Sequence, residues 1–341
     1  MNIRIVSKMV NSAKQGVLAT VMLFFVSIFF SIPMLANDTL EEPLMPKGYA
    51  TEAQLKMALL TGQVKLIDAK NIPVPDSVRE IKGLEYGKVG QRPLHLDLYL
   101  PKTDKPVPGL IFIHGGAWKS GNRADMKFYA IKYAARGYAT ATISYRLTNE
   151  APFPAAVHDT KCAVRWMRAN AKKYNINPDK IGVSGNSAGG HLSMMAGYSS
   201  DVAKLEGVGG HPGISSSVQV VVNFYGPADL TTSFARKQEV LHDFLSGKQY
   251  DDDPELYAFA SPITHLTRDD PPTLILHGTI DSTVPIAQAD KLAKKLEQLN
   301  IPMVYEKFPG WPHTMDLAEP VNDRCCYLMD RFLEKYLPLP K

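Results

Sequence analysis

Short apolar runs alternate with amphipathic stretches of helical period over most of the chain, from about residue 110 to residue 336. This order is typical of a mostly parallel sheet, because each connection between parallel strands has to cross over a face of the sheet, usually as a helix. The sequence therefore predicts an α/β fold with helices on both faces of the sheet. The predicted strands are 110–113, 139–144, 181–184, 218–224, 273–276 and 303–308, and the predicted helices are 126–136, 155–171, 187–198, 286–299 and 323–336.

Four segments lie outside this alternation. Residues 94–100 have the two-residue period of a half-buried strand and predict an antiparallel strand at the edge of the sheet. A short helix is expected after Thr51, because Gln54 follows it with the spacing of a capping box. Residues 201–217 and 231–261 match neither a strand nor a crossover helix. The second of these segments is either a solvated turn or a cap over a pocket.

Residues 1–36 have the composition of a signal peptide. A basic start precedes the apolar run 17–32, and Ala36 offers a cleavage site. The apolar run is shorter than the roughly 20 residues that span a membrane, so export is expected, with an uncleaved N-terminal anchor as the alternative. The sequence thus predicts an exported protein, periplasmic or extracellular, for which the membrane is a partner only if the leader is retained.

The charge of the rest of the chain is nearly balanced. The sequence has 38 basic and 34 acidic residues, and three of the basic residues but no acid lie in the leader. No basic stripe remains, which argues against a nucleic acid partner. In an oxidising compartment three cysteines cannot all pair internally, so Cys162, Cys325 and Cys326 are expected to be buried free thiols. No metal-ligand spacing is present, so no metal is expected.

The sequence GNSAG at 185–189 follows a predicted strand and begins a predicted helix. A serine at such a sharp turn exposes its hydroxyl, and the flanking glycines leave room for the tight backbone. This context predicts that Ser187 is a nucleophile. The alternative is a serine that only caps the helix.

The sequence HGGAW at 114–118 comes directly after another predicted strand. Two glycines at this place allow backbone N–H groups to point outward, as an oxyanion hole requires, since its donors must be fixed before charge develops on a tetrahedral intermediate. We expect these donors from Gly116 and Ala117, with Gly115 as a substitute for one of them, and from Ala188, which follows the predicted nucleophile. The alternative is a plain glycine turn after a strand.

Together these motifs resemble the α/β-hydrolase superfamily, in particular its esterase and lipase branch with an HGGxW oxyanion motif, which includes bacterial acetyl esterases and feruloyl-esterase-like hydrolases. SYRL at 144–147, FPAAVHD at 153–159 and HGTID at 277–281 also carry the resemblance, which runs from about residue 80 to the end. It implies the α/β-hydrolase fold, a mostly parallel sheet of about eight strands with a small cap. The expected domains are a signal peptide at 1–36, a linker and N-terminal cap segment at 37–80, and a catalytic domain at 81–341.

The resemblance also implies the order serine, acid, histidine for a catalytic triad, with the acid in the loop after the penultimate strand. Asp281 lies there. Asp229, after the preceding strand, is the rival, although a turn or helix cap would explain it structurally. Of the nine histidines, His313 follows the last predicted strand, and loops at that end of a sheet face one crevice. His191 is closer to Ser187 in sequence but lies one helical turn deeper.

The sequence therefore predicts an exported serine carboxylesterase. Ser187 would attack an ester carbonyl, His313 would act as base and then acid, and Asp281 would orient it, through an acyl-enzyme and without metal or organic cofactor. The expected substrates are short-chain acyl esters, including acetylated or aryl-acylated carbohydrates. The alternatives are a prolyl-oligopeptidase-like serine peptidase, an arylformamidase, and a non-catalytic adhesion or scaffold member of the fold.

Overall fold

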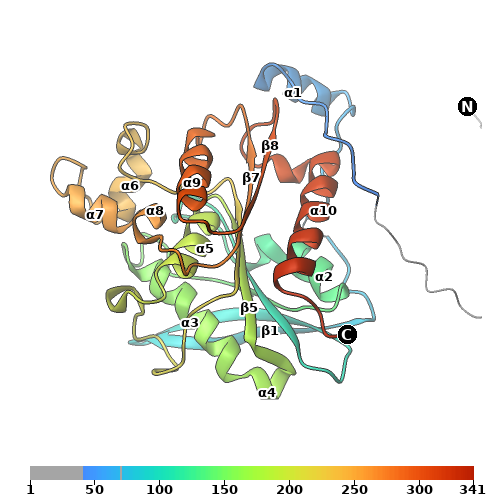
Figure 1. Ribbon diagram of the computed structural model, residues 1–341, viewed down its shortest axis with the longest axis vertical. Helices are drawn as coiled ribbons and strands as arrows, with labels where there is room; N and C mark the ends of the chain where they lie inside the picture. Colours follow the sequence, from blue (N-terminus) through green and yellow to red (C-terminus); the bar gives the residue numbers. More distant parts are fainter. Residues whose placement is uncertain (1–40, 70) are drawn as a thin grey trace, which may run out of the picture. The chain divides into compact units, whose positions relative to one another are not determined.

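The computed structural model describes residues 41–69 and 71–341, so the predicted signal peptide and its cleavage site lie outside the described residues. Within this part of the chain, eight strands form one sheet in the order β1-β2-β4-β3-β5-β6-β7-β8 (Figure 1). The strands are β1 (Val78–Val89), β2 (Arg92–Pro101), β3 (Val107–Ile113), β4 (Ala139–Ile143), β5 (Ile176–Asn186), β6 (Val220–Phe224), β7 (Thr273–Gly278) and β8 (Met303–Phe308).

The sheet is parallel except at one end. β2 runs antiparallel to both of its neighbours, β1 and β4, and the other neighbouring pairs are parallel. The prediction of an edge strand at 94–100 is therefore wrong: these residues lie in β2, the second strand, and β1 forms the edge. β1 carries polar residues on both faces and has register shifts around Gly83, as edge strands often do. Its mixed composition is the reason that no strand is predicted there.

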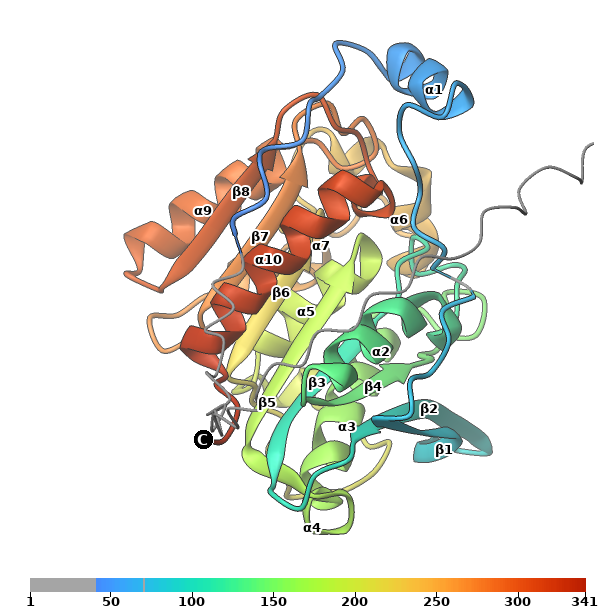
Figure 2. The same ribbon diagram turned by 90° about the vertical axis from the view of Figure 1, so that its right-hand side faces the viewer.

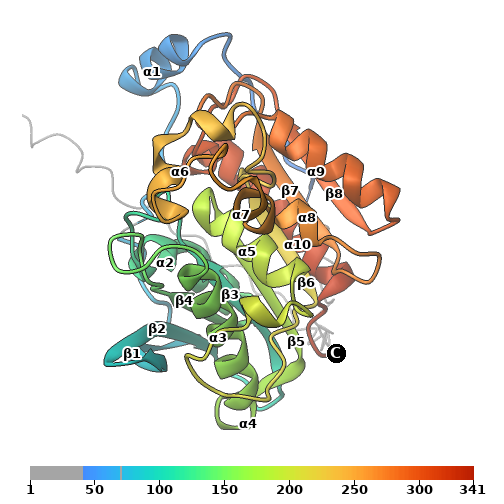
Figure 3. The same cartoon turned by 90° about the vertical axis from the view of Figure 1, so that its left-hand side faces the viewer.

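Helices cover both faces of the sheet, as predicted. α2 and α10 lie on one face (Figure 2), and α3, α5 and α9 lie on the other (Figure 3). The alternation of side chains in β3 shows the two layers directly: Leu110 and Phe112 belong to the first core, and Ile111 and Ile113 to the second. The helices are α1 (Glu52–Leu60), α2 (Lys127–Ala135), α3 (Ala155–Ala169), α4 (Ala171–Tyr174), α5 (Ala188–Tyr198), α6 (Glu239–Phe244), α7 (Pro254–Phe259), α8 (Pro262–His265), α9 (Ala287–Gln298) and α10 (Glu319–Tyr336), with the short 3-10 helices η1 (Arg123–Met126), η2 (Ala203–Leu205), η3 (Ala235–Lys237) and η4 (Met315–Leu317).

The two unassigned segments have different structures. Residues 201–217 form a mostly irregular loop around η2, whereas residues 231–261 fold into η3, α6 and α7. The predicted helix after Thr51 is present as α1, and the Thr51 side chain accepts a hydrogen bond from the backbone N–H of Gln54 at 3.3 Å. Among the described residues, no helix has the length and apolar character needed to cross a membrane.

The three cysteines are free and buried, as predicted. Burial raises the pKa of each thiol, so all three stay protonated at neutral pH and behave as small apolar side chains.

Candidate active site

The backbone turns sharply at Ser187, between the end of β5 and the start of α5. Ser187 has φ 53° and ψ −119°, a strained conformation for a residue with a side chain. The flanking glycines make this turn possible. A Cβ atom on Gly185 would lie 2.3 Å from the carbonyl oxygen of Gly189, and one on Gly189 would lie 2.0 Å from that of Ile113.

The structure brings Ser187, His313 and Asp281 into one chain of hydrogen bonds. His313 Nε2 lies 3.0 Å from Ser187 Oγ, and His313 Nδ1 lies 2.7 Å from Asp281 Oδ2. Because an ionised carboxylate can only accept, Nδ1 carries the proton and Nε2 is free to accept from the serine hydroxyl. An imidazole held in this way can take up the hydroxyl proton while the serine attacks an electrophile.

Asp281 is kept ionised by its neighbours. Burial alone would raise its pKa, but hydrogen bonds from His277 and His313 and from the backbone N–H of Val284 outweigh burial and lower the pKa to about 2. The Oδ1 atom accepts from the N–H groups of Thr283 at 2.9 Å and Val284 at 2.8 Å. The carboxylate is therefore fixed and charged next to the imidazole.

His277 is a neighbour of this site to which the sequence analysis gave no role. Its Nε2 atom lies 2.7 Å from the carbonyl oxygen of Val284 and 3.3 Å from Asp281 Oδ2. Both partners are acceptors, so Nε2 carries the proton and donates to them. The motif at 277–281 contained His277, and its spacing of four residues from the expected acid was the available signal.

The residues proposed for the oxyanion hole lie next to Ser187. Ala117 has φ 54° and Gly116 has φ 107°, so the loop after β3 turns through left-handed conformations there. Within the described part of the chain, no hydrogen bond engages the backbone N–H groups of Gly116, Ala117 or Ala188. Ala117 and Ala188 line the same pocket as Ser187, whereas Gly116 lies one residue back from it. The N–H groups nearest to Ser187 can thus receive a developing negative charge.

That pocket, which we call the Ser187 pocket, lies under the 231–261 insertion. It holds about 510 Å³ of empty space including its open mouth. The insertion contributes mainly apolar side chains to the pocket, as a cap does, while its acidic residues 251–252 lie in an exposed turn. Trp118, from the loop after β3, stacks on Phe244 of the cap with ring centroids 4.3 Å apart. The apolar side chains that line the pocket include Trp118, Leu230, Phe234, Val240 and Leu241.

The rival acid and the rival base have structural partners. Asp229 accepts from the backbone N–H and hydroxyl of Thr231 at 2.8 and 2.6 Å and pairs with Lys291, which makes it an Asx-type turn. His191 is fully buried, with Nε2 2.8 Å from the carbonyl oxygen of Ala260, and burial lowers its pKa to about 4. Neither residue contacts the chain of hydrogen bonds at Ser187.

A second set of buried groups packs against the His313 imidazole. The ring of Tyr225 packs against the imidazole at 4.6 Å, and its hydroxyl donates to Asp316. Asp316 also accepts from Tyr129 at 2.9 Å. Burial raises the pKa of this carboxyl group. The sequence offers no signal for this arrangement, because Asp316 lies 91 residues from Tyr225 and 187 from Tyr129.

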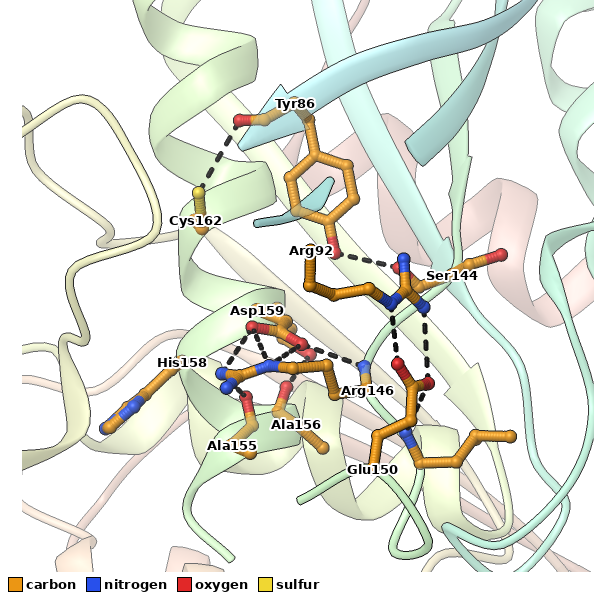
Figure 4. Close-up of polar contacts among 12 residues, drawn as sticks. Tyr86, Arg92, Ser144, Arg146, Glu150, Ala155, Ala156, His158, Asp159 and Cys162 are labelled. Carbon is orange, nitrogen blue, oxygen red and sulfur yellow. Dashed lines mark hydrogen bonds and ion pairs between the residues drawn. The ribbon is translucent and has the colours of Figure 1, made fainter. Parts of the chain in front are cut away.

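Two of the stretches that carry the family resemblance contact each other. Arg146 Nη2 donates to Asp159 Oδ1 at 2.8 Å, and its Nε to Asp159 Oδ2 at 2.9 Å, a two-pronged contact inside the first turns of α3 (Figure 4). A second ion pair joins Arg92, at the start of β2, to Glu150 in the loop between β4 and α3, at 2.5 Å. These contacts fix the loop between β4 and α3, which connects residues 144–147 with residues 153–159.

Comparisons with known proteins agree with this description. The BD-FAE family model matches residues 96–296. The esterase LipC of Mycobacterium tuberculosis is 36% identical over 222 residues, which are 63% of this chain and 55% of LipC, so the chain spans about half the length of that relative. A truncated carbohydrate esterase from gut microbiota has a TM-score of 0.67 and 28% identity, covering 76% of this chain and 98% of that one. Thermogutta terrifontis esterase Est2, solved with butyrate bound, has a TM-score of 0.67 and 26% identity, covering 78% and 97%.

The family model covers more than half of the chain, and its match begins in β2 and runs through the turn at Ser187 to α9. The eight-stranded sheet, with its antiparallel end and its helices on both faces, is the α/β-hydrolase fold seen in these esterase structures. On this evidence the chain belongs to the BD-FAE family of α/β-hydrolase esterases.

Proposed function

We propose that this protein is a serine carboxylesterase that hydrolyses short-chain acyl esters. The observation that carries the proposal is the hydrogen-bonded chain from Asp281 through His313 to Ser187, at an apolar pocket beside two unengaged N–H groups. The names of the similar proteins support the reaction class, since LipC and both structural neighbours are called esterases.

The reaction would proceed in two halves. Ser187 Oγ attacks the ester carbonyl carbon while His313 Nε2 takes the hydroxyl proton, and the N–H groups of Ala117 and Ala188, with Gly116, stabilise the oxyanion. The carbon–oxygen bond to the alcohol then breaks, and His313 gives its proton to the alcohol oxygen. Water next attacks the acyl-enzyme with His313 again as base, which releases the acid and restores Ser187. Asp281 stays ionised throughout and stabilises the imidazolium.

The Ser187 pocket is proposed to receive the acyl group. Its apolar side chains Leu230, Phe234 and Leu241 come from the cap and its approaches, and they leave room for a compact group. The similar esterase with bound butyrate supports a short acyl chain, and the similar carbohydrate esterase supports acetylated or aryl-acylated carbohydrate as a second substrate class.

A series of p-nitrophenyl esters from C2 to C16 tests this proposal. We expect kcat/KM to be highest from acetyl to butyryl and to fall with longer chains, because each added methylene that finds no apolar surface forgoes about 0.8 kcal/mol. Leu241→Ala, which enlarges the pocket, should shift the maximum to longer chains, and Ser187→Ala should remove activity along the whole series. A maximum at C10 or longer would contradict the proposal.

We also propose that the protein acts outside the cytoplasm, because residues 1–36 have the order of a signal peptide. N-terminal sequencing of the protein from the extracytoplasmic fraction should then start at Asn37. A mature protein that retains residues 17–32 and partitions with the membrane would instead support the anchor.

A further inference from the structure

The N-terminal segment of the described chain binds one flank of the loop that carries His313. The backbone N–H of Tyr49 donates to the carbonyl oxygen of Gly310 at 3.0 Å, and the indole N–H of Trp311 donates to that of Pro46 at 3.4 Å. Gly48 lies so close to Pro309 that a Cβ atom there would be 1.7 Å from the carbonyl oxygen of Pro309. The N-terminal segment is thus packed against the backbone just before His313.

The same segment returns to bind the other flank of this loop. The N–H of Ile67 donates to the carbonyl oxygen of Leu317 at 2.8 Å, and the N–H of Glu319 donates to that of Lys65 at 2.9 Å. Between these two attachments lies α1, at the end of the sheet where β7 and β8 end (Figure 1). The hydroxyl of Ser282, next to Asp281, donates to Glu52 at the start of α1 at 2.9 Å. The family model matches residues 96–296, so this segment, like the His313 loop, lies outside the matched part of the chain.

A second pocket, the α1 pocket, lies between α1 and the His313 loop. It holds about 660 Å³ of empty space including its open mouth. Leu59 is half-buried, and Leu66 and Leu317 remain 55% and 39% exposed, so apolar surface is left uncovered beside the site. The residues that line this pocket are Glu52, Leu55, Lys56, Leu59, Leu66, Trp311, Pro312, His313, Thr314, Met315, Leu317 and Ala318.

Each pocket is lined by one of the two residues that share the Ser187–His313 hydrogen bond. Ser187 lines the Ser187 pocket and His313 lines the α1 pocket, and Ser187 Oγ lies 3.0 Å from His313 Nε2. In ester hydrolysis the acyl carbon becomes bonded to Ser187 Oγ. The alcohol oxygen leaves with the electron pair of the broken carbon–oxygen bond and takes the proton from His313 Nε2. The alcohol group must therefore lie close to His313, and His313 lines the α1 pocket.

We propose that the α1 pocket binds the alcohol portion of the substrate and selects alkyl or aryl alcohols over sugars. The inference rests on the proposed esterase function, and it narrows the substrate class by setting aside the carbohydrate esters that were named as the second class. Leu55, Leu59, Leu66 and Leu317 present an apolar surface to the leaving group, and among the lining residues only Glu52 and Lys56 carry a fixed charge. A sugar would lose hydrogen bonds to water against such leucines, whereas an alkyl or aryl group would gain from burial.

Acetate esters with different alcohols test the inference, because the acyl group is then constant. Wild-type enzyme should favour benzyl and butyl acetate over methyl acetate and over acetylated glucose. Leu66→Asp should lower kcat/KM for benzyl acetate about tenfold, through KM, and leave methyl acetate within twofold. Leu59→Ala, which removes apolar surface without adding charge, should act in the same direction if Leu66→Asp fails to fold. Leu60→Asp is the matched control, since Leu60 lies on α1, is 84% exposed and does not line the pocket.

The outcomes separate this inference from the proposed function. If wild-type enzyme hydrolyses acetates but the benzyl-to-methyl ratio is unchanged in both pocket variants, the inference is wrong and the esterase proposal stands. An equal loss on all acetates, or the same shift in Leu60→Asp, would also overturn it. If wild-type enzyme hydrolyses none of the esters, both proposals fall together.

Discussion

The loops after β6 and after β7 resemble each other in sequence. The aspartate in each loop, however, has a different charged or titratable partner. Asp229 and Asp281 are both buried, 2% and 6% exposed, and both accept a hydrogen bond from the backbone N–H two residues further on. The second oxygen makes the difference. That of Asp229 pairs with Lys291 of α9, whereas that of Asp281 faces His313.

Both aspartates are ionised, so charge alone does not distinguish them. Burial raises the pKa of each, and hydrogen bonds outweigh it, from Lys291 and Thr231 for Asp229 and from His277 and His313 for Asp281. A lysine ammonium is charged before, during and after a reaction. An imidazole becomes charged only when it takes a proton. A carboxylate beside it therefore stabilises the imidazolium more than the neutral imidazole. The partner, rather than the aspartate, thus decides which loop can take part in proton transfer.

The largest expected effect concerns Ser187 and His313, the two residues that hydrogen bonds connect to Asp281. Ser187→Ala and His313→Ala should each lower kcat by at least about a thousandfold, and the double variant should lose little more, because the residues act as one unit. Steady-state kinetics on p-nitrophenyl acetate, with circular dichroism to verify folding, measures this. Additive losses would mean that the two side chains act independently.

The next effect tests the difference between Asp281 and Asp229 directly. Asp281→Asn should lower kcat by roughly 10² to 10⁴, since an amide no longer holds the same imidazole tautomer or stabilises the imidazolium. Asp229→Asn should leave kcat within threefold and lower stability, since it removes the buried partner of Lys291. Initial rates and urea unfolding of both variants give the answer. A damaging Asp229→Asn with a harmless Asp281→Asn would assign the acid to the other loop.

A smaller effect appears in the dependence of stability on pH. The pKa of Asp281 is about 2 in the folded protein and about 3.8 in its ordinary state, so this group stabilises the fold above about pH 4 and loses that contribution as the pH falls towards 2. Asp281→Asn should flatten this decline by about 2 kcal/mol. Urea unfolding between pH 7 and pH 2.5 measures the difference between the two proteins. A parallel decline in both would show that Asp281 is not the titrating group.

The smallest effect concerns Lys291 of α9, the partner of Asp229. Lys291 is 54% exposed, so Lys291→Met should cost no more than about 1 kcal/mol of unfolding free energy and leave kcat unchanged. Lys294→Met, on the exposed face of the same helix, is the matched control and should change neither quantity. A loss of activity in Lys291→Met alone would connect the Asp229 loop to catalysis after all.

Elements built from unbroken apolar runs were predictable, and those that depend on pairing were not. β3 was predicted at 110–113 because Leu110, Ile111, Phe112 and Ile113 form a continuous apolar run, and all four residues are buried in this strand. β1 was not predicted, because Arg79, Glu80 and Lys82 interrupt its apolar pattern. Its extended structure depends on the hydrogen bonds to β2. For the same reason the sequence placed 94–100 at the edge: nothing within β2 reveals that another strand lies outside it.

The site was predictable where its geometry is local. The glycines beside Ser187 predict a tight turn within five residues. Asp281 and His313 were predicted from the order of loops in the family, and not from any property of their own. Tyr225 and Asp316, which support the imidazole, could not be predicted, because their contact joins side chains 91 residues apart. The distance along the chain, more than the type of residue, limits what the sequence shows.

The attachment of the N-terminal segment to the His313 loop has a consequence for the order of folding. Pro46 and Trp311 are separated by 265 residues, so their contact cannot form until the chain between them is available. Contacts between such distant residues form late, since the loop between them must close first. The turn at Ser187 can be built from nearby strands, but the His313 loop acquires its final contacts last. Activity should therefore appear as the final event of refolding, after the recovery of secondary structure.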